Sequence, residues 1–230
     1  MLPNLRSIFQ RESSPGPNPG PWQTPQPSPA LRKPLARATQ LTRHSRGVEQ
    51  FFSDIRGVVG LSVLDFAGAS QENIDFLTSL GHKIYTQDMV RTLDDAFGAN
   101  PGDQTNPGRI DYFLKSNFDY PADTFGGALL WDAFQFMGPA LLGATVERLY
   151  DVMQPKSYIL AFFNSNEKAP LVPSYNFRLL DNKTIQLSDR GMRPSGQVFN
   201  NRSLERLFGK FESVKFFLTR DSLREVIIRR

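Results

Sequence analysis

The sequence contains no cysteine and only two histidines, His44 and His82, among its 230 residues. The absence of cysteine excludes disulfides, a thiolate nucleophile and cysteine-ligated metal or iron–sulfur sites. Two histidines are too few for a multi-histidine metal site, so we expect no metal centre. The chain also lacks the run of about 20 apolar residues that spans a bilayer, and its N-terminus lacks the apolar core of a signal peptide. These absences predict a cytoplasmic protein without a transmembrane segment.

Positive charge is concentrated at the N-terminal end of the chain. Residues 1–48 hold seven basic residues and one acidic residue, which gives this segment a formal charge of +6. The remaining residues hold 20 basic and 22 acidic side chains and carry −2, although the whole chain is formally +4 with a pI near 9.4. A nucleic-acid-binding domain is expected to be basic over its own surface. We therefore expect no nucleic-acid partner for the larger part of the chain.

Proline is equally uneven in its distribution. Eight of the 17 prolines lie between Pro15 and Pro34, together with glycine, serine, asparagine and glutamine. Such a composition offers too little apolar surface to offset the entropy of ordering the chain. We therefore predict a disordered, proline-rich basic arm over residues 1–45. Residues 46–230 are long enough for a single domain with its own core.

The first 11 residues contain a short amphipathic pattern. Leu2, Leu5, Ile8 and Phe9 would share one side of a helix. Such a segment can dock on a protein partner or contact a membrane surface weakly. It can equally fold back on its own domain or fray as a chain end.

Strand and helix patterns alternate along the predicted domain. Short apolar runs predict buried strands at residues 61–66, 83–86, 127–131 and 158–163. Apolar spacings of three and four predict helices at residues 46–56, 74–80, 90–97 and 142–153, whereas residues 110–118 fit either a helix or a strand. Repeated strand–helix units predict a mostly parallel, Rossmann-like sheet between two helical layers, a three-layer α/β/α arrangement.

The end of the chain has a different pattern. Residues 175–180 and 184–187 flank a polar turn and predict an inserted hairpin. Asn201 is expected to cap a short helix. The last two predicted strands, 214–219 and 226–229, are joined by a tight polar link that permits only antiparallel pairing. An antiparallel C-terminal hairpin should therefore close the sheet.

In this order, three segments resemble class I S-adenosylmethionine-dependent methyltransferases. They are the first strand and its loop, Val63-Leu64-Asp65-Phe66-Ala67-Gly68-Ala69-Ser70-Gln71, the segment from Phe118 to Asp132, and the closing strand pair with Phe216-Phe217-Leu218 and Val226-Ile227-Ile228. The resemblance covers residues 60–230. It implies a seven-stranded Rossmann-like sheet that binds S-adenosylmethionine.

The resemblance implies a cofactor site that begins at the end of the first strand. Ala67, Gly68 and Ala69 would form a turn whose small side chains let the cofactor approach the backbone. Where the family commonly has three glycines, this chain has Ala67, Ala69 and Gln71, and alanine fits at little cost where φ is negative. Asp65 would lie near the methionine ammonium group of the cofactor.

Residues on later strands complete the implied site. Asp88 ends the second strand, is followed by Met89 and would accept hydrogen bonds from both ribose hydroxyls. Asn117 and Phe118 would lie beside the adenine. Trp131, at the mouth of the fourth strand, would face the position of methyl transfer.

Each position also has a structural interpretation. Asp88 can serve as the N-cap of the next helix, and Asp65 can make only structural hydrogen bonds inside its apolar strand. Trp131 can be a core aromatic residue. Asp132 can cap the following helix or act as a base, so no catalytic residue is assigned. His82 follows a helix-to-strand turn, where we expect solvent exposure rather than catalysis.

The resemblance implies methyl transfer from S-adenosylmethionine to a small-molecule acceptor. The alternative is a catalytically inactive module of the same fold that binds a partner or serves as a scaffold, since a fold does not fix a function. A nicotinamide-dependent oxidoreductase fits less well, because the first turn lacks the G-x-G-x-x-G pattern.

Overall fold

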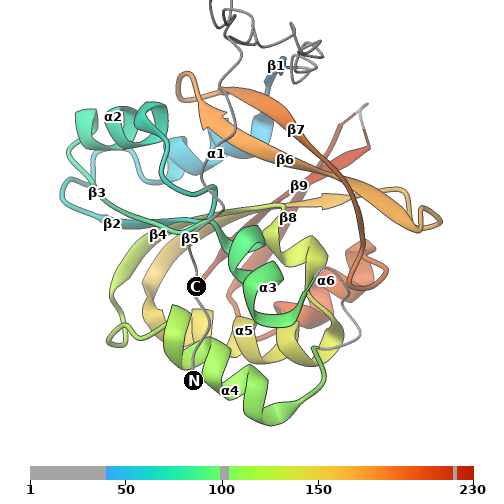
Figure 1. Cartoon of the computed structure of the whole chain (residues 1–230). Helices are drawn as coiled ribbons and strands as arrows, with labels where there is room; N and C mark the ends of the chain where they lie inside the picture. The colour runs from blue at the N-terminus through green and yellow to red at the C-terminus, as the bar shows by residue number, and fades with distance from the viewer. Residues whose placement is uncertain (1–39, 99–103, 220–221) are drawn as a thin grey trace, which may run out of the picture. The chain divides into compact units, whose positions relative to one another are not determined.

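The computed structural model describes residues 40–98, 104–219 and 222–230 (Figure 1). All of them belong to one compact unit, Ala38–Arg230. Most of the predicted N-terminal arm, including the amphipathic residues 1–11, lies outside the described residues. In the part of the chain that is described, no helix is both long enough and apolar enough to span a membrane.

A mixed sheet forms the centre of the fold. Its strands are β2 (Ser62–Asp65), β3 (Lys83–Thr86), β4 (Phe125–Trp131), β5 (Met153–Asn164), β8 (Ser213–Leu218) and β9 (Leu223–Arg229). They lie in the order β3-β2-β4-β5-β9-β8, with the first four parallel and β9 antiparallel to both of its neighbours. The predicted parallel sheet with an antiparallel closing hairpin is therefore confirmed.

The predicted number of seven strands is wrong, because the described residues contribute six strands to this sheet. The region that could have held another strand forms helix α4 (Pro107–Asn117), which resolves the ambiguity over residues 110–118. The side chain of Asn106 caps this helix, and Pro107 occupies its first turn, where the missing N–H costs nothing. Local capping therefore selects helix over strand.

Among the described residues, six further helical segments flank the sheet. They are α1 (Arg46–Asp54), α2 (Gln71–Ser79), α3 (Met89–Phe97), the 3₁₀ helix η2 (Ala133–Phe136), α5 (Pro139–Val152) and α6 (Asn201–Leu207). Asn200 caps α6 in a capping box with Ser203, so the predicted cap at Asn201 is displaced by one residue. The predicted exposure of His82 is also wrong: its side chain is buried and lines a small cavity with Phe52 and Ile55.

The two faces of the sheet pack against different layers, as Figure 1 shows. On one face, alternate residues of the central strands join a core with α3, α4, α5 and α6. On the other face, the intervening residues pack against α1, α2 and a second sheet. The alternation follows from the strand period of two. The three-layer prediction therefore needs one correction, since a second sheet occupies part of one outer layer.

That second sheet is antiparallel and contains β1 (Gln40–His44), β6 (Leu171–Leu179) and β7 (Thr184–Pro194) in the order β1-β7-β6. Its β6–β7 pair is the predicted inserted hairpin. The strand β1 corrects the boundary of the predicted arm, because residues 40–45 pair with β7 and cap α1 through Ser45. The segment QLTRH is mostly polar and exposed, which explains why no strand was predicted there.

Candidate functional site

The implied cofactor residues of the first loop do meet at the carboxyl ends of parallel strands. Ala67 forms an isolated bridge with Asp88, and the N–H of Gly68 donates to the carbonyl of Gln87 at 3.2 Å. Gly68 has a φ of +83°, and a Cβ there would lie 3.1 Å from the Cβ of Asp88. Ala67 and Ala69 are not among the residues with positive φ. The one glycine of the loop thus stands where glycine is required, and the alanines are unstrained.

Asp65 is fully buried and makes structural hydrogen bonds. Its Oδ1 accepts from the backbone N–H of Ala67 at 3.0 Å and from Nε1 of Trp131 at 2.6 Å, and its Oδ2 accepts from Nδ2 of Asn73 at 2.8 Å. Burial raises the pKa of this carboxyl, although the three donors oppose the shift. Donors of the protein itself therefore bind the carboxylate of Asp65, which the resemblance placed near the ammonium group of the cofactor.

Three other implied cofactor residues lie in the hydrophobic core. Trp131 is 1% exposed and stacks on Phe177 of β6, with ring centroids 4.9 Å apart. Phe118 packs edge-to-face against Phe66, and Met89 is fully buried on the same side of the sheet. For Trp131 the geometry matches the core interpretation that the sequence left open.

Asn117 is held by its neighbours. Its Oδ1 accepts from Nε2 of Gln87, and its Nδ2 donates to the carbonyl of Phe113 at 2.7 Å. Gln87 directly precedes Asp88, so this bond connects the end of α4 to the end of β3.

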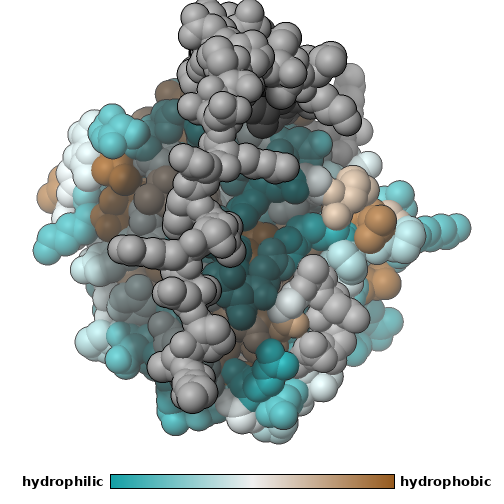
Figure 2. Space-filling view, in the orientation of Figure 1, coloured by the Kyte–Doolittle hydropathy of each residue, from teal (hydrophilic) through white to brown (hydrophobic). Residues whose placement is uncertain are grey.

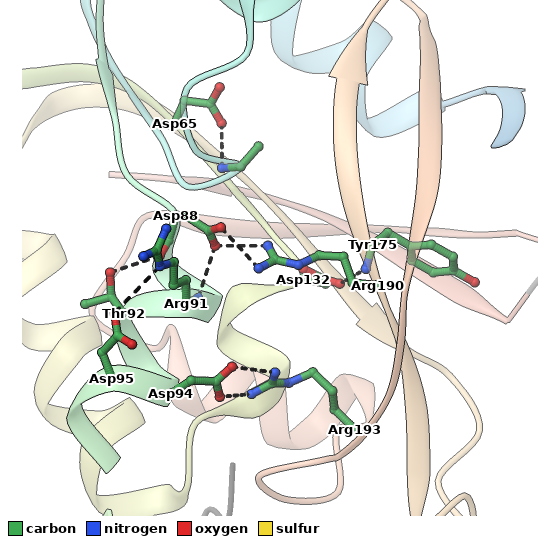
Figure 3. A network of polar contacts seen from close by, with 11 residues as sticks. Asp65, Asp88, Arg91, Thr92, Asp94, Asp95, Asp132, Tyr175, Arg190 and Arg193 are labelled. Atoms are coloured by element: carbon green, nitrogen blue, oxygen red, sulfur yellow. Dashed lines mark hydrogen bonds and ion pairs between the residues drawn. The ribbon is translucent and has the colours of Figure 1, made fainter. Parts of the chain in front are cut away.

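Asp88 carries the central polar contact of this edge. Arg190 of β7 donates to both carboxylate oxygens of Asp88, at 2.9 Å to Oδ1 and 3.1 Å to Oδ2, as Figure 3 shows. Oδ1 also accepts from the backbone N–H of Arg91, so Asp88 is the N-cap of α3. The side chain of Asp88 is 33% exposed and that of Arg190 is 21% exposed. Of the two carboxylates that the resemblance places at the cofactor, Asp65 and Asp88, only Asp88 is accessible, and Arg190 is bonded to it.

A second arginine pair lies beside the first. Arg193 of β7 forms a two-pronged ion pair with Asp94 of α3, with one bond of 2.8 Å between its Nη1 and Oδ2. Its guanidinium also lies 5.2 Å from the centre of the Phe136 ring. Hydrophilic side chains gather at the centre of the face in Figure 2, where Figure 1 places α3 and β7. The hairpin therefore contacts α3 through two arginines.

Asp132, directly after β4, has a strongly raised pKa. It is 5% exposed, and its Oδ2 accepts from the backbone N–H of Tyr175 at 2.9 Å. Burial raises its pKa to about 7, opposed by this hydrogen bond and by the positive charges of Arg190 and Arg193. Its side chain makes no capping bond to η2. The structure thus holds a carboxyl that titrates near neutral pH beside the two arginines.

Sequence reasoning missed Arg190 and Arg193. The pairs Arg190–Asp88 and Arg193–Asp94 span 102 and 99 residues, so no local spacing indicates them. The only local signal is the Asp189-Arg190-Gly191 segment, which is typical of a turn or bulge and names no partner.

A cavity lies near this edge, where β5 ends. Its volume is about 280 Å³. It is lined by residues that include Gln135, Asn164, Lys168, Val172, Ser195 and Phe199. Polar and apolar groups of this kind suit a small organic molecule. Within residues 40–98, 104–219 and 222–230, no three histidine, aspartate or glutamate side chains are arranged to bind a metal ion.

The fit of the residues to S-adenosylmethionine is therefore partial. Asp88 can present both oxygens to a ribose once Arg190 leaves, and Gly68 keeps the loop free of a side chain opposite it. Asp65 is fully buried and already accepts three hydrogen bonds from protein groups, so it is not presented to the ammonium group.

No protein-family model and no curated protein matches the sequence. Solved structures do match. A 1,6-didemethyltoxoflavin N1-methyltransferase from Burkholderia thailandensis, with bound 1,6-didemethyltoxoflavin and S-adenosylhomocysteine, is 12% identical over 80% of this chain and 76% of its own, with a TM-score of 0.47. An S-adenosylmethionine-dependent methyltransferase from Archaeoglobus fulgidus is 14% identical over 80% of this chain and 91% of its own, with a TM-score of 0.47.

A glycopeptide N-methyltransferase complexed with S-adenosylmethionine is 11% identical over 79% of this chain and 93% of its own, with a TM-score of 0.40. Each match is a similarity of fold alone, and the named activities and ligands belong to those proteins.

Proposed function

We propose that this chain binds S-adenosylmethionine at the carboxyl edge of its parallel strands and transfers the methyl group to a small-molecule acceptor. The observation that carries the proposal is Asp88, a partly exposed carboxylate at the end of β3 that faces a glycine with positive φ across the first loop. Ligands of open α/β sheets bind beyond the carboxyl ends of the strands, where this carboxylate lies.

The Arg190–Asp88 pair lowers cofactor affinity without excluding binding. Hydrogen bonds to charged groups contribute roughly 1.5–3 kcal/mol when buried, and partly exposed pairs such as this one contribute less. A ligand with a micromolar dissociation constant gains about 8 kcal/mol. For a ligand of that affinity the gain would exceed the loss, so the pair would reduce its affinity without closing the site.

The bound cofactor would supply a methyl group that leaves a sulfonium by in-line displacement, and the protein would mainly orient the two reactants. Where the acceptor is a hydroxyl, a base near neutral pKa assists. Asp132, a buried carboxyl directly after β4, is the candidate for that base. The cavity beside Gln135 and Asn164 offers a place for the acceptor.

A second candidate function is a catalytically inactive module that binds a partner. Two observations favour this function. Asp65 accepts its hydrogen bonds from protein groups, and Asp88 is paired with Arg190, so both carboxylates that were expected to bind the cofactor already have protein partners. Docking through residues 1–11 remains a prediction, since these residues lie outside the described part.

Calorimetric titration with S-adenosylmethionine and S-adenosylhomocysteine separates the two functions. Binding by the full chain should weaken in Asp88→Ala by about 1–3 kcal/mol, the scale for lost charged hydrogen bonds. Asp94→Ala is the matched control, because it removes an equivalent arginine pair on the same helix. If the full chain does not bind at millimolar ligand, the proposal that it is an enzyme is rejected. If Asp88→Ala and Asp94→Ala lose the same amount of affinity, the ribose does not bind at Asp88.

A further inference from the structure

A β-bulge directs Arg190 toward α3. Residues three apart on a regular strand point to opposite faces, yet Arg190 and Arg193 both reach α3. The register with β6 shifts between Ser174 and Tyr175, which leaves Arg190 as an extra residue of β7. Gly191 has a φ of +98°, and its N–H donates to Oδ1 of Asp189 at 2.6 Å. Bulges that redirect a side chain are common beside functional sites.

Arg190 has two carboxylates within reach of its charge. It is bonded to Asp88, and its charge also lowers the pKa of Asp132. In Figure 3 the guanidinium is directed at Asp88, and the carboxyl of Asp132 lies near the stem of Arg190 in this view. On the neighbouring elements, Arg193 is bonded to Asp94 and its charge also acts on Asp132 and Asp88. Arg91 and Asp95 form an exposed pair.

We propose that Arg190 is an internal competitor for the ribose at Asp88, and that it passes to Asp132 when the cofactor binds. The inference rests on the proposed function and adds a determinant of cofactor affinity to that site. A vicinal diol would need both oxygens of Asp88, and Arg190 holds both. The guanidinium and the diol therefore compete for the same two oxygens.

The displaced guanidinium requires a new partner. Its side chain is 21% exposed, and a partly buried cation without a counter-charge is costly. Asp132 supplies that charge by releasing its proton to solvent, so the carboxyl becomes a carboxylate and the guanidinium stays protonated. The approach of the guanidinium lowers the pKa of Asp132 below its value of about 7. Cofactor binding at pH 6 is therefore accompanied by release of up to one proton.

The test is calorimetry of S-adenosylmethionine binding to the full chain and three variants at pH 6. Arg190→Gln should tighten binding about tenfold, because it removes the competitor and keeps a polar side chain. Arg190→Lys should lie between the wild type and Arg190→Gln, since an ammonium cannot hold both oxygens in the same fork. Lys210→Gln, which breaks the exposed ion pair with Glu147 of α5, is the control and should leave affinity unchanged. Thermal unfolding of each variant verifies that it folds.

A second measurement follows the proton. Titrations in buffers of different ionisation enthalpy should show proton release for the wild type and none for Asp132→Asn. Unchanged or weaker binding in Arg190→Gln, with normal binding by the wild type, would overturn the competitor while the proposed function stands. If neither the wild type nor any variant binds, the proposed function and this inference both fail.

Discussion

The indole N–H of Trp131 donates a 2.6 Å hydrogen bond to Oδ1 of Asp65, which joins the end of β4 to the end of β2. The other carboxylate oxygen accepts from Asn73 of α2, and Oδ1 of Asn73 in turn accepts from the backbone N–H of Leu179 on β6 at 2.7 Å. Asp65 thus connects the central sheet, α2 and the second sheet through one buried network. The carboxylate that the resemblance assigned to the cofactor therefore holds three parts of the fold together.

Removing this carboxylate should destabilise the fold. Asp65→Ala leaves the buried donors of Trp131 and Asn73 without acceptors, and we expect a loss of about 2–5 kcal/mol in the free energy of unfolding. Urea unfolding measures it. Asp75→Ala is the control. It removes an exposed hydrogen bond between Gln71 and Asp75 on α2 and should cost less than about 0.5 kcal/mol. Near-native stability of Asp65→Ala with lost cofactor binding would instead support the ligand role.

The sequence predicted those parts of the fold that depend on neighbouring residues. The strand at 83–86 and the helices around it follow from local periodicity, and the structure places them within a few residues of the expected bounds. The partners of Asp65 and Asp88 could not be predicted, because Trp131 and Arg190 lie 66 and 102 residues away. The polar strand β1 was missed for a related reason, since its stability comes from pairing with β7 rather than from its own composition.

Stability should fall as the pH rises through the titration of Asp132. Its pKa is about 7 in the folded chain against 3.8 for an exposed carboxyl, so its contribution is complete below about pH 4 and is lost through pH 7. The difference between pH 5 and pH 7 should reach about 2–3 kcal/mol, from 1.36 kcal/mol per unit. Urea unfolding of the wild type and Asp132→Asn at both values isolates this group. An identical pH dependence in the two proteins would contradict the raised pKa.

The N-terminal boundary of the domain can be tested by truncation. Glu225 is fully buried and accepts hydrogen bonds from Arg43, the hydroxyl of Ser45 and the N–H of Gly47. A chain that starts at residue 46 loses the first two donors, and we expect about 3–5 kcal/mol of destabilisation because a buried charge loses its partner. A chain that starts at residue 39 retains these contacts.

Thermal and urea unfolding of the two truncated chains gives the difference directly. Adding Glu225→Gln to the shorter chain should recover part of the loss, since the substitution removes the uncompensated charge. Equal stability of the two chains would return the boundary to residue 46.

The three small residues of the first loop should respond differently to substitution. Gly68→Ala should destabilise by about 1–3 kcal/mol, because φ is +83° and the new Cβ would lie 3.1 Å from the Cβ of Asp88. Ala67→Gly and Ala69→Gly bring the loop closer to the family's usual glycines, yet both residues are unstrained. Each should therefore lower stability by about 0.4–1 kcal/mol through the entropy of the unfolded chain. Urea unfolding ranks the three variants, and a stabilising Ala67→Gly or Ala69→Gly would mean that the alanine in question is strained.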